Sequence, residues 1–373
     1  MMQFIDLSKQ QSLIRNNIKQ RISKVLDHGQ YIMGPEVDEL EEKLASYVDA
    51  KFCLTCSSGT DALLIPLMAK GVGPGDAVLT TTFSYIATAE VIKLVGATPI
   101  FIDIDPETYN LNPALIPDAI IEAHKKELEP KAIIPVDIFG QPANYIEIKK
   151  YADIYDLFII EDAAQAFGAS IQNKKTCTFG NVGSTSFFPS KPLGCYGDGG
   201  AVFTDDEDLY EIMKSIRVHG EGKDKYDNIR LGLNGRLDTL QAAVLLEKLL
   251  LFPNELSMRE RIANYYSNNL PTIFKKPYVP SKYFSSWAQY SLVSESFEIR
   301  SKLIDFCSKN SIPIMVYYRI PLHMQNVFKS LGYSKGEFCV SEDLSGKIFS
   351  IPMHPYLTSN KQNEIIEALL KFN

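Results

Sequence analysis

The sequence of 373 residues contains no long uninterrupted apolar segment. One of its most apolar stretches, VLTTTFSYIATAEVIKLVGA, is broken by polar residues well short of the roughly 20 apolar residues that a membrane-spanning helix needs. The first residues, MMQFIDLSKQQSLIRNNIKQ, also lack the basic, apolar and small-residue order of a secretory signal. We therefore expect a cytoplasmic protein without a membrane span.

Cysteine and positive charge are also scarce. Six cysteines are too few for a disulfide scaffold in a chain of this length and favour a reducing compartment. Cys53 and Cys56 form a CxxC, but no second CxxC or CxxH completes four zinc ligands, so we predict no metal site. Acidic residues outnumber basic residues by 45 to 38, and the resulting net charge of -7 offers no general attraction for nucleic acid or anionic lipid.

A dinucleotide-binding fingerprint is missing as well. The glycine-rich segment GVGPGD at 71–76 lacks the G-x-G-x-x-G spacing and precedes a strand-like run instead of opening a helix. We therefore predict a turn there, and the sequence gives no support to an oxidoreductase. Hydrophobic residues at 45% and charged residues at 22% are ordinary values for a globular protein.

From about residue 50 onward, short strand-like runs alternate with helix-like runs. The strand-like runs are FCLTC, AVLTTT, TPIFIDID, KAIIPVDIF, LFIIEDAA, GSTSFFPS and GAVFTD. Helices are expected from Asp61, from Ile86, near 114–126 and around 145–154. This alternation predicts an α/β fold with a mostly parallel sheet that is covered by helices.

The last third of the sequence has a different pattern. A helix is predicted from Arg236 to about Leu251, and the PN pair at 253 and 254 is expected to end it. After about residue 280 the sequence contains the segment SSWAQYSLV, a predicted helix near 297–309, the strand-like segment PIMVYY and a final predicted helix from about Lys361. We therefore predict a large domain over 1–252 that begins with a helical segment, and a smaller C-terminal α+β domain over 253–373.

Ligands of open α/β sheets bind beyond the carboxyl ends of the strands, so residues that end strand-like runs are candidates for chemistry. In SSGTDALL a strand ends at 57–59 and a helix opens at Thr60, where free N–H groups suit a phosphate or simply an ordinary helix start. LFIIEDAAQ ends in two carboxylates, of which one must point toward the active edge because strand side chains alternate. An exposed acidic turn is the alternative.

Two further strand ends carry a lysine and two aromatic residues. Lys191 ends the run STSFFPSK and precedes a glycine-dense loop. In a desolvated site such a lysine loses its proton readily and can form Schiff bases, whereas in a solvated loop it has no special role. Phe83 and Tyr85 follow AVLTTT and share a face if the chain stays extended, where they supply either a stacking surface for a ring or core packing.

A Schiff-base lysine, a carboxylate for a pyridinium nitrogen, a phosphate site and a stacking aromatic are together what pyridoxal phosphate requires. The sequence also resembles the fold-type I sugar aminotransferases of the DegT/DnrJ type over essentially its whole length. The matching segments include FIDLSKQ, HGQYIMGPEVDELEEKLA, GATPIFIDIDPETYNL, EDAAQAFGA, NGRLDTLQAA and IPMHPYL. The resemblance implies an aspartate aminotransferase-like fold and pyridoxal 5'-phosphate as the cofactor.

The resemblance also implies roles for individual residues. Lys191 matches the catalytic lysine that binds the cofactor covalently, and Asp162 matches the partner of the pyridine nitrogen. The rest of the cofactor site is implied to be Gln165 at the ring oxygen, Tyr85 stacked on the ring, and Gly59, Thr60 and Ser186 at the phosphate. Asn234 matches an asparagine that reaches the phosphate from the neighbouring subunit, which implies a homodimer with shared active sites.

Glutamate is the implied amino donor, leaving 2-oxoglutarate, and a nucleotide-linked keto-sugar is the implied acceptor. The segment TSFFPSKPLGCYGDGGA is most similar to enzymes that aminate C3 of a UDP-linked 2-acetamido-2-deoxy-3-oxo sugar, including the glucuronate form used in bacterial surface polysaccharides such as O-antigen and lipopolysaccharide. Those uronate enzymes usually carry His-Tyr where this sequence has Tyr317 and Tyr318, followed here by Arg319 instead of proline. Arg236 or Arg319 could contact a carboxylate, and a neutral 3-oxo sugar is the competing substrate.

Two other functions use the same fold. A nucleotide-sugar dehydratase of this type carries histidine in place of the Schiff-base lysine, so Lys191 argues against it. A non-catalytic ligand-sensing regulator would not need Lys191, Asp162 and Gln165 together, and their presence disfavours that function.

Overall fold

The computed structural model describes residues 2–224 and 226–372. Its helices are α1 (Ser8–His28), α2 (Pro35–Val48), α3 (Gly59–Ala69), α4 (Ala87–Leu94), α5 (Ile116–Lys125), α6 (Tyr145–Tyr155), α7 (Glu207–Arg217), α8 (Thr239–Asn269), α9 (Phe297–Lys309), α10 (Cys339–Lys347) and α11 (Ser359–Lys371). Its strands are β1 (Phe52–Cys56), β2 (Asp76–Thr81), β3 (Thr98–Ile102), β4 (Glu129–Ile134), β5 (Phe158–Asp162), β6 (Ser170–Ile171), β7 (Lys174–Lys175), β8 (Val182–Ser186), β9 (Gly200–Thr204), β10 (Tyr283–Phe284), β11 (Tyr290–Val293) and β12 (Ile348–Ile351).

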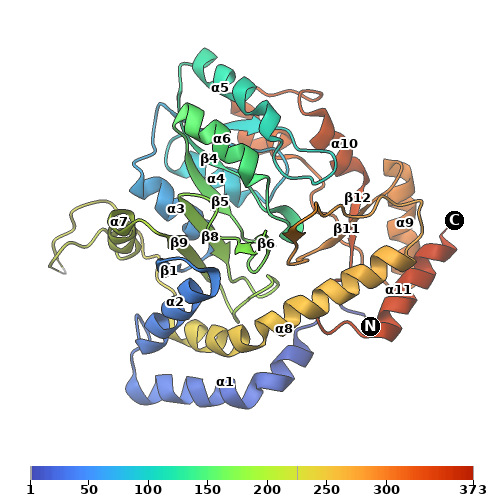
Figure 1. The fold of residues 1–373 in the computed structure, drawn as a ribbon, viewed down its shortest axis with the longest axis horizontal. Helices are drawn as coiled ribbons and strands as arrows, with labels where there is room; N and C mark the ends of the chain where they lie inside the picture. The colour runs from blue at the N-terminus through green and yellow to red at the C-terminus, as the bar shows by residue number, and fades with distance from the viewer. Residues whose placement is uncertain (1, 225, 373) are drawn as a thin grey trace.

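A seven-stranded sheet forms the centre of the molecule, with the strand order β1-β9-β8-β5-β4-β2-β3. The pairs from β8 to β3 are parallel, and only β9 runs antiparallel to its neighbours β1 and β8. Figure 1 shows the sheet inside the molecule, with helices around it. The predicted α/β fold with a mostly parallel sheet is therefore confirmed.

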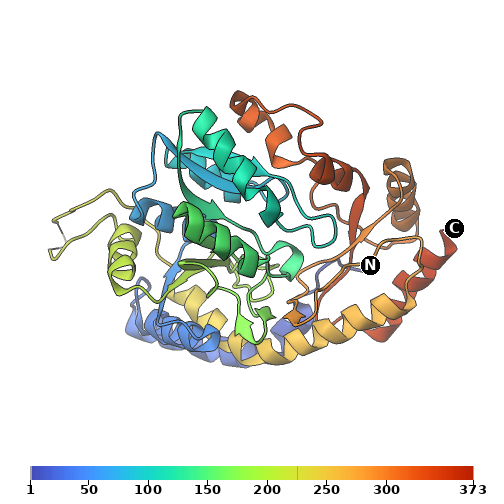
Figure 2. The same ribbon diagram turned by 45° about the horizontal axis from the view of Figure 1, so that its top comes forward.

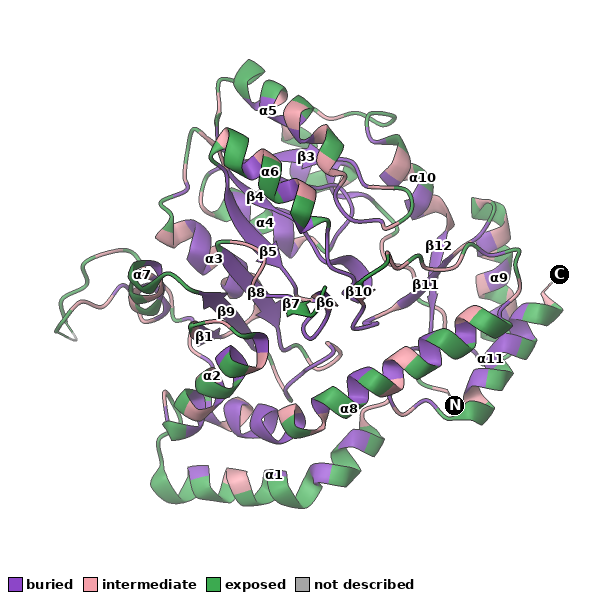
Figure 3. Cartoon of the chain, viewed as in Figure 1, coloured by how far each residue is buried: buried purple, intermediate pink, exposed green. Residues whose placement is uncertain are grey.

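Burial explains why these segments form strands and helices. The central strands are buried along almost their whole length because helices cover the sheet, which matches their continuous apolar sequences (Figure 3). Helix α5 buries Ile116, Ala119, Ile120 and Ala123, a spacing of three and four residues that places them on one face. The helices therefore turn apolar faces to the sheet and polar faces to solvent.

Helix α8 is longer than the sequence suggested. The predicted end at 253 and 254 is wrong, because α8 runs without a break from Thr239 through Pro253 to Asn269. Proline weakens a helix by removing one N–H donor and crowding the preceding turn. Here α8 packs against α1, α2 and α11 and buries side chains along its length, so tertiary contacts outweigh that cost. Figure 2 shows α8 running beneath the molecule from α2 to α11.

The C-terminal part contains the antiparallel pair β11 and β12 with α9 and α11. The segment PIMVYY does not form the predicted strand, since only Met315 bridges to Ser350 of β12. Beyond that bridge the segment returns to the large sheet, where the ring of Tyr318 packs edge-on against Phe83 with centroids 5.7 Å apart.

The division of the chain at residue 252 remains a prediction, and that boundary falls inside α8. The residues before α1 lie with the C-terminal part, since the ring of Phe4 contacts Tyr317 at 6.2 Å between centroids. No helix within 2–224 and 226–372 is long and apolar enough to cross a membrane.

Candidate functional site

Several of the predicted site residues lie where β1, β5 and β8 end. Asp162 is the last residue of β5, and β5 pairs in parallel with β8, which ends at Ser186. The loop after β8 carries Lys191, and a backbone hydrogen bond from its N–H to the carbonyl of Phe188 at 2.9 Å fixes the turn. Parallel strands thus bring together residues that lie far apart in the sequence.

Asp162 is a buried carboxylate with defined hydrogen-bond donors. Its Oδ2 accepts from the hydroxyl of Thr88 at 2.8 Å, and its Oδ1 accepts from the N–H of Ala164 at 3.2 Å. Burial raises the pKa of Asp162 above its ordinary value, and these two hydrogen bonds together with the positive charge of Lys191 oppose that change. The carboxylate therefore depends on its partners to remain ionised.

Lys191 lies close enough to Asp162 for the two charges to interact. Burial lowers the pKa of Lys191 from its ordinary value, while the carboxylate of Asp162 favours the charged amine. Lys191 also lies on the wall of a pocket with Lys248, Arg259 and His354. A partly desolvated amine of this kind is more readily deprotonated than a surface lysine and can act as a nucleophile.

Gly59, Thr60 and Ser186, the residues predicted to bind the phosphate, lie at the start of α3 and are called the anion cup below. Ser58 caps this helix, and its hydroxyl accepts from the N–H of Asp61 at 3.1 Å. The N–H groups of Gly59 and Thr60 precede the first intrahelical bonds and therefore need another acceptor. Gly59 packs closely on Ser186, because a Cβ added at Gly59 would lie 2.6 Å from the Ser186 Cβ.

Gln165 is fixed in one orientation by hydrogen bonds to both ends of its amide. The N–H of Phe139 donates to Oε1 of Gln165 at 2.8 Å, and Nε2 of Gln165 donates to the hydroxyl of Tyr318 at 3.0 Å. Burial raises the pKa of Tyr318, so its hydroxyl stays neutral. Tyr318 therefore lies in the same cluster as Gln165, close enough to Asp162 for the carboxylate to affect its pKa.

The two aromatic residues after β2 separate from each other. Phe83 is 1% exposed and packs in the core, whereas Tyr85 is 60% exposed at the turn before α4. The chain leaves the extended conformation directly after Thr81, so the condition under which the two rings would share one face is not met. Tyr85 alone presents a free ring surface for stacking.

The other predicted residues lie in less defined surroundings. Asn234 is exposed, and the carbonyl of the next residue, Gly235, accepts from the N–H of Ser57 at 2.9 Å. Arg236 is half-buried, and its Nε has no partner among the described residues. Tyr317 is half-buried and in ring contact with Tyr318.

Thr88 and Phe139 were not anticipated from the sequence. Thr88 holds Asp162 through its hydroxyl, and Phe139 orients Gln165 through its backbone N–H. Thr88 lies 74 residues before Asp162, so neither motif nor spacing could connect them. A backbone donor such as that of Phe139 carries no signature in the sequence at all.

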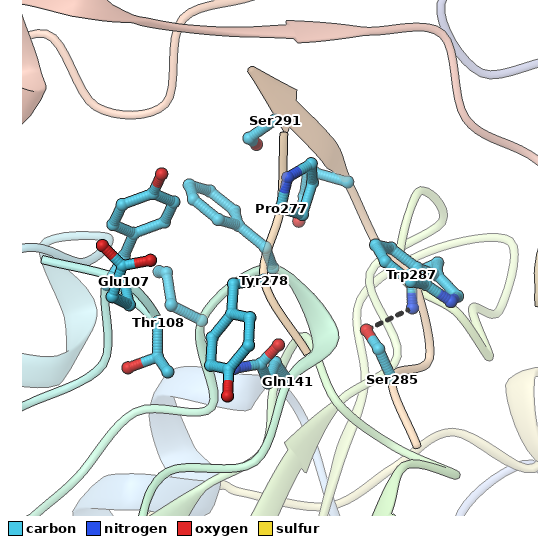
Figure 4. A pocket seen from close by; sticks show the side chains of 12 residues that line it. Glu107, Thr108, Gln141, Pro277, Tyr278, Ser285, Trp287 and Ser291 are labelled. Atoms are coloured by element: carbon cyan, nitrogen blue, oxygen red, sulfur yellow. Dashed lines mark hydrogen bonds between the residues drawn. The ribbon is translucent and has the colours of Figure 1, made fainter. Parts of the chain in front are cut away.

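A separate pocket, lined in part by Phe139, lies between the loop at 107–109 and the segment at 277–291 (Figure 4). Figure 4 shows Tyr278, Trp287 and Gln141 on its walls, and the N–H of Trp287 donates to the hydroxyl of Ser285 at 3.1 Å. None of the predicted site residues lines this pocket. Among the described residues, no group of three or more His, Cys, Asp or Glu side chains is placed to hold a metal ion.

These residues fit pyridoxal phosphate. The anion cup suits the phosphate, the buried Asp162 suits a protonated ring nitrogen, and Lys191 is the amine that the carbonyl carbon of the cofactor requires. Fold and site together define a fold-type I, pyridoxal phosphate-dependent aminotransferase.

Comparison with known proteins identifies the family. Residues 12–370 match the DegT/DnrJ/EryC1/StrS aminotransferase family, and the chain belongs to it. It is 45% identical over 371 residues, covering 99% of each chain, to the UDP-2-acetamido-2-deoxy-3-oxo-D-glucuronate aminotransferase of Pseudomonas aeruginosa.

Solved structures of related proteins have the same fold as this chain. A DegT DnrJ EryC1 StrS aminotransferase from Brucella abortus superposes with a TM-score of 0.96 at 48% identity, covering 100% of this chain and 99% of that chain. NtdA from Bacillus subtilis, solved with bound cofactor PMP, superposes with a TM-score of 0.89 at 27% identity, covering 99% of this chain and 83% of that chain.

Proposed function

We propose that this aminotransferase moves the amino group of glutamate to C3 of UDP-2-acetamido-2-deoxy-3-oxo-glucuronate. The observation that carries the proposal is that Lys191 and Asp162 lie at the ends of the paired strands β8 and β5, close enough for their charges to interact, at the sheet edge where α3 begins. The sugar is proposed from the 45% identity to the Pseudomonas enzyme over nearly the whole of both chains.

When bound, pyridoxal phosphate supplies a carbonyl group for amine exchange and a ring that accepts an electron pair. In our proposal, Asp162 holds a proton on the ring nitrogen, since an ionised carboxylate stabilises a nearby cation. Lys191, once free as an amine, would move a proton from the glutamate carbon to the reacting carbon of the cofactor in the first half of the reaction, and from that carbon to the sugar carbon in the second half. Thr88 keeps Asp162 ionised by donating a hydrogen bond to its Oδ2.

Gln165, Tyr85 and the anion cup hold the cofactor in place. One hydrogen of the Gln165 amide is used on Tyr318, which leaves the second hydrogen for the ring oxygen of the cofactor. The exposed ring of Tyr85 offers the stacking surface. Gly59 keeps the cup open, because a larger side chain there would collide with Ser186.

Recognition of the C6 carboxylate is proposed for Arg236 or Arg319, since a guanidinium binds a carboxylate with two parallel hydrogen bonds. The unpartnered Nε of Arg236 supports the first of these. Tyr317 and Tyr318 are the further proposed sugar contacts. Because they stand where the uronate enzymes usually carry His-Tyr, a neutral UDP-3-oxo-N-acetylhexosamine remains the second candidate substrate.

We further propose a homodimer in which Asn234 reaches the phosphate of the partner site. The exposure of Asn234 supports this, since an exposed polar side chain next to the cup region is available to a neighbouring chain.

All six cysteines are free thiols, which supports a reducing compartment such as the cytoplasm. The proposed product would serve the synthesis of a bacterial surface polysaccharide such as an O-antigen.

The test is the visible absorption spectrum of the purified protein with pyridoxal phosphate, recorded before and after glutamate. A band that bleaches with glutamate and returns with the UDP-3-oxo-glucuronate supports the proposal. Return only with the neutral sugar supports the second candidate. Absence of any band, even with added cofactor, would instead favour a ligand-sensing protein on the same fold.

Carboxylate recognition is tested with Arg236→Gln and Arg319→Gln as a matched pair. Replacing the arginine that binds the carboxylate should raise KM for the uronate sugar and leave KM for the neutral sugar unchanged. If neither variant changes the ratio of the two KM values, neither arginine recognises the carboxylate.

A further inference from the structure

Two carboxylic acids lie directly behind Asp162. Glu161 is the residue before it in β5, and Asp137 follows the adjacent strand β4. Both side chains are 0% exposed. No ion pair within 2–224 and 226–372 joins either of them to a lysine, arginine or histidine, so two buried acids face each other without a cation.

The hydrogen bonds identify Glu161 as the ionised member of this pair. Its Oε1 accepts from the backbone N–H of Cys177 at 2.6 Å, and its Oε2 accepts from the N–H of Phe179 at 2.8 Å. Backbone N–H groups can only donate, so they stabilise the charged form of a carboxyl group. Glu161 therefore has the better environment for a negative charge.

Asp137 has the opposite environment at one of its oxygens. Its Oδ1 accepts from the N–H of Ala143 at 2.8 Å and from the hydroxyl of Tyr145 at 2.9 Å. Its Oδ2 is fully buried and has no donor among the described residues. If Oδ2 carries a proton and donates a hydrogen bond to Glu161, Oδ2 is no longer without a partner and the two acids no longer repel each other.

Burial raises the pKa of both acids, and that of Glu161 rises to about 7 although its backbone donors oppose the rise. Burial, followed by the charge of Glu161, raises the pKa of Asp137 well above its ordinary value. The other titratable groups that face the pair are Tyr145 of α6, Tyr283 of β10, Cys177 and Asp162, and none of them carries a positive charge.

The pair is tied to Asp162 through the backbone. The N–H of Asp137 donates to the carbonyl of Asp162 at 3.0 Å, and the N–H of Asp162 donates to the carbonyl of Pro135 at 2.9 Å. Because strand side chains alternate, Glu161 and Asp162 point to opposite faces of the sheet. Any separation of the two acids would therefore move the backbone that carries Asp162.

We propose that Asp137 and Glu161 share one proton across neutral pH, with Asp137 as donor and Glu161 as acceptor, and that this pair positions Asp162 at the active edge of the sheet. Asp137 and Glu161 are positioning residues, since they act through the backbone of Asp162 and point away from its carboxylate. The last part of this inference rests on the role proposed above for Asp162, whereas the shared proton does not.

Asp137→Asn tests the shared proton directly. An amide has the shape of the protonated acid: its N–H₂ can donate to Glu161 while its oxygen accepts from Ala143 and Tyr145. Infrared spectroscopy of the folded full-length protein at pH 7 should show the carbonyl band of a neutral carboxyl group that is absent from Asp137→Asn. Identical carboxyl bands in the two proteins, or an Asp137→Asn chain that does not fold, would overturn the proposal.

The pH dependence of unfolding provides a second readout. The folded pair binds one proton, whereas both acids are ionised in the unfolded chain above about pH 5, so wild-type stability falls as the pH rises toward the raised pKa of Asp137. Relative to Asp137→Asn, the unfolding equilibrium constant of wild type should increase about tenfold per pH unit between pH 6 and 8. Parallel pH profiles for the two proteins would contradict a bound proton.

Glu161→Gln tests whether Glu161 is the member of the pair that carries the negative charge. A glutamine places an N–H₂ group against one of the two backbone donors, so one N–H is left without an acceptor. We expect Glu161→Gln to unfold more easily than wild type at every pH, and a variant as stable as Asp137→Asn at pH 7 would refute the assignment of the anion to Glu161.

The link to Asp162 is tested by titrating pyridoxal phosphate into wild type and Asp137→Asn at pH 7 and pH 9. Wild type should lose more affinity for the cofactor than Asp137→Asn over this range, and an equal loss would refute the positioning role. If the infrared and unfolding results hold but neither protein binds the cofactor, the proposed function fails and the shared proton stands.

Discussion

Thr88 should control the ionisation of Asp162, and replacing it with valine tests this. Valine has the same branched shape as threonine but no hydroxyl, so the change removes the 2.8 Å hydrogen bond to Oδ2 of Asp162 with little change in packing. Both residues are buried, at 1% and 4% exposed, so water cannot replace the missing donor without rearrangement.

The magnitude follows from the nature of the bond. A hydrogen bond to a charged group contributes about 1.5–3 kcal/mol, and each 1.4 kcal/mol corresponds to a factor of about ten. Thr88→Val should therefore weaken cofactor binding roughly 10- to 150-fold, provided that the cofactor requires ionised Asp162. Thr88→Ser keeps the hydroxyl and serves as the matched control.

The pH profile should change in a defined direction. Thr88 lowers the pKa of Asp162, so its removal raises that pKa further above the ordinary value. Activity requires the ionised carboxylate and is lost as the pH falls, so the acidic limb of kcat/KM in Thr88→Val should move to higher pH. The assays are cofactor titration by absorbance and rate measurements from pH 5 to 9. Equal affinities and equal acidic limbs in Thr88→Val and Thr88→Ser would refute the reasoning.

Three further changes test the remaining parts of the site. Lys191→Ala should abolish turnover and the spectral response to glutamate, and a fully active variant would exclude Lys191 as the nucleophile. Gly59→Ala should weaken cofactor binding at least about tenfold because the added methyl group collides with Ser186, whereas Gly346→Ala, with open space around it, should bind normally; equal affinities would argue against the anion cup. Tyr85→Ala should weaken cofactor binding about two- to tenfold through lost stacking, and Tyr85→Phe should restore it; a result in which both bind like wild type would exclude stacking.

Several properties of this protein follow from the sequence alone. The alternation of strand-like and helix-like runs predicts the α/β sheet because each strand is short, apolar and bounded by polar turns, and these signals are local. The ends of strand-like runs also make Lys191 and Asp162 candidates for chemistry, since such ends meet at one edge of a parallel sheet. The cofactor roles of these two residues and of the anion cup come from the family resemblance and remain predictions.

Other properties were decided by tertiary contacts. The continuity of α8 through Pro253 depends on the elements that pack against it, which a local proline signal does not include. Phe83 and Tyr85 are both aromatic, and only the path of the chain after β2 decides which one is buried.

The most consequential decisions concern hydrogen bonds over long distances in the sequence. Thr88 donates a hydrogen bond to Asp162, which lies 74 residues later in the sequence. Asp137 faces Glu161 because β4 and β5 are neighbours in the sheet. Ionisation in such a site is set by burial and by the donors that surround each group, and the chain brings these donors together only when it folds. The sequence thus determined which chemical groups are present, and the tertiary structure decided which of them carry charge.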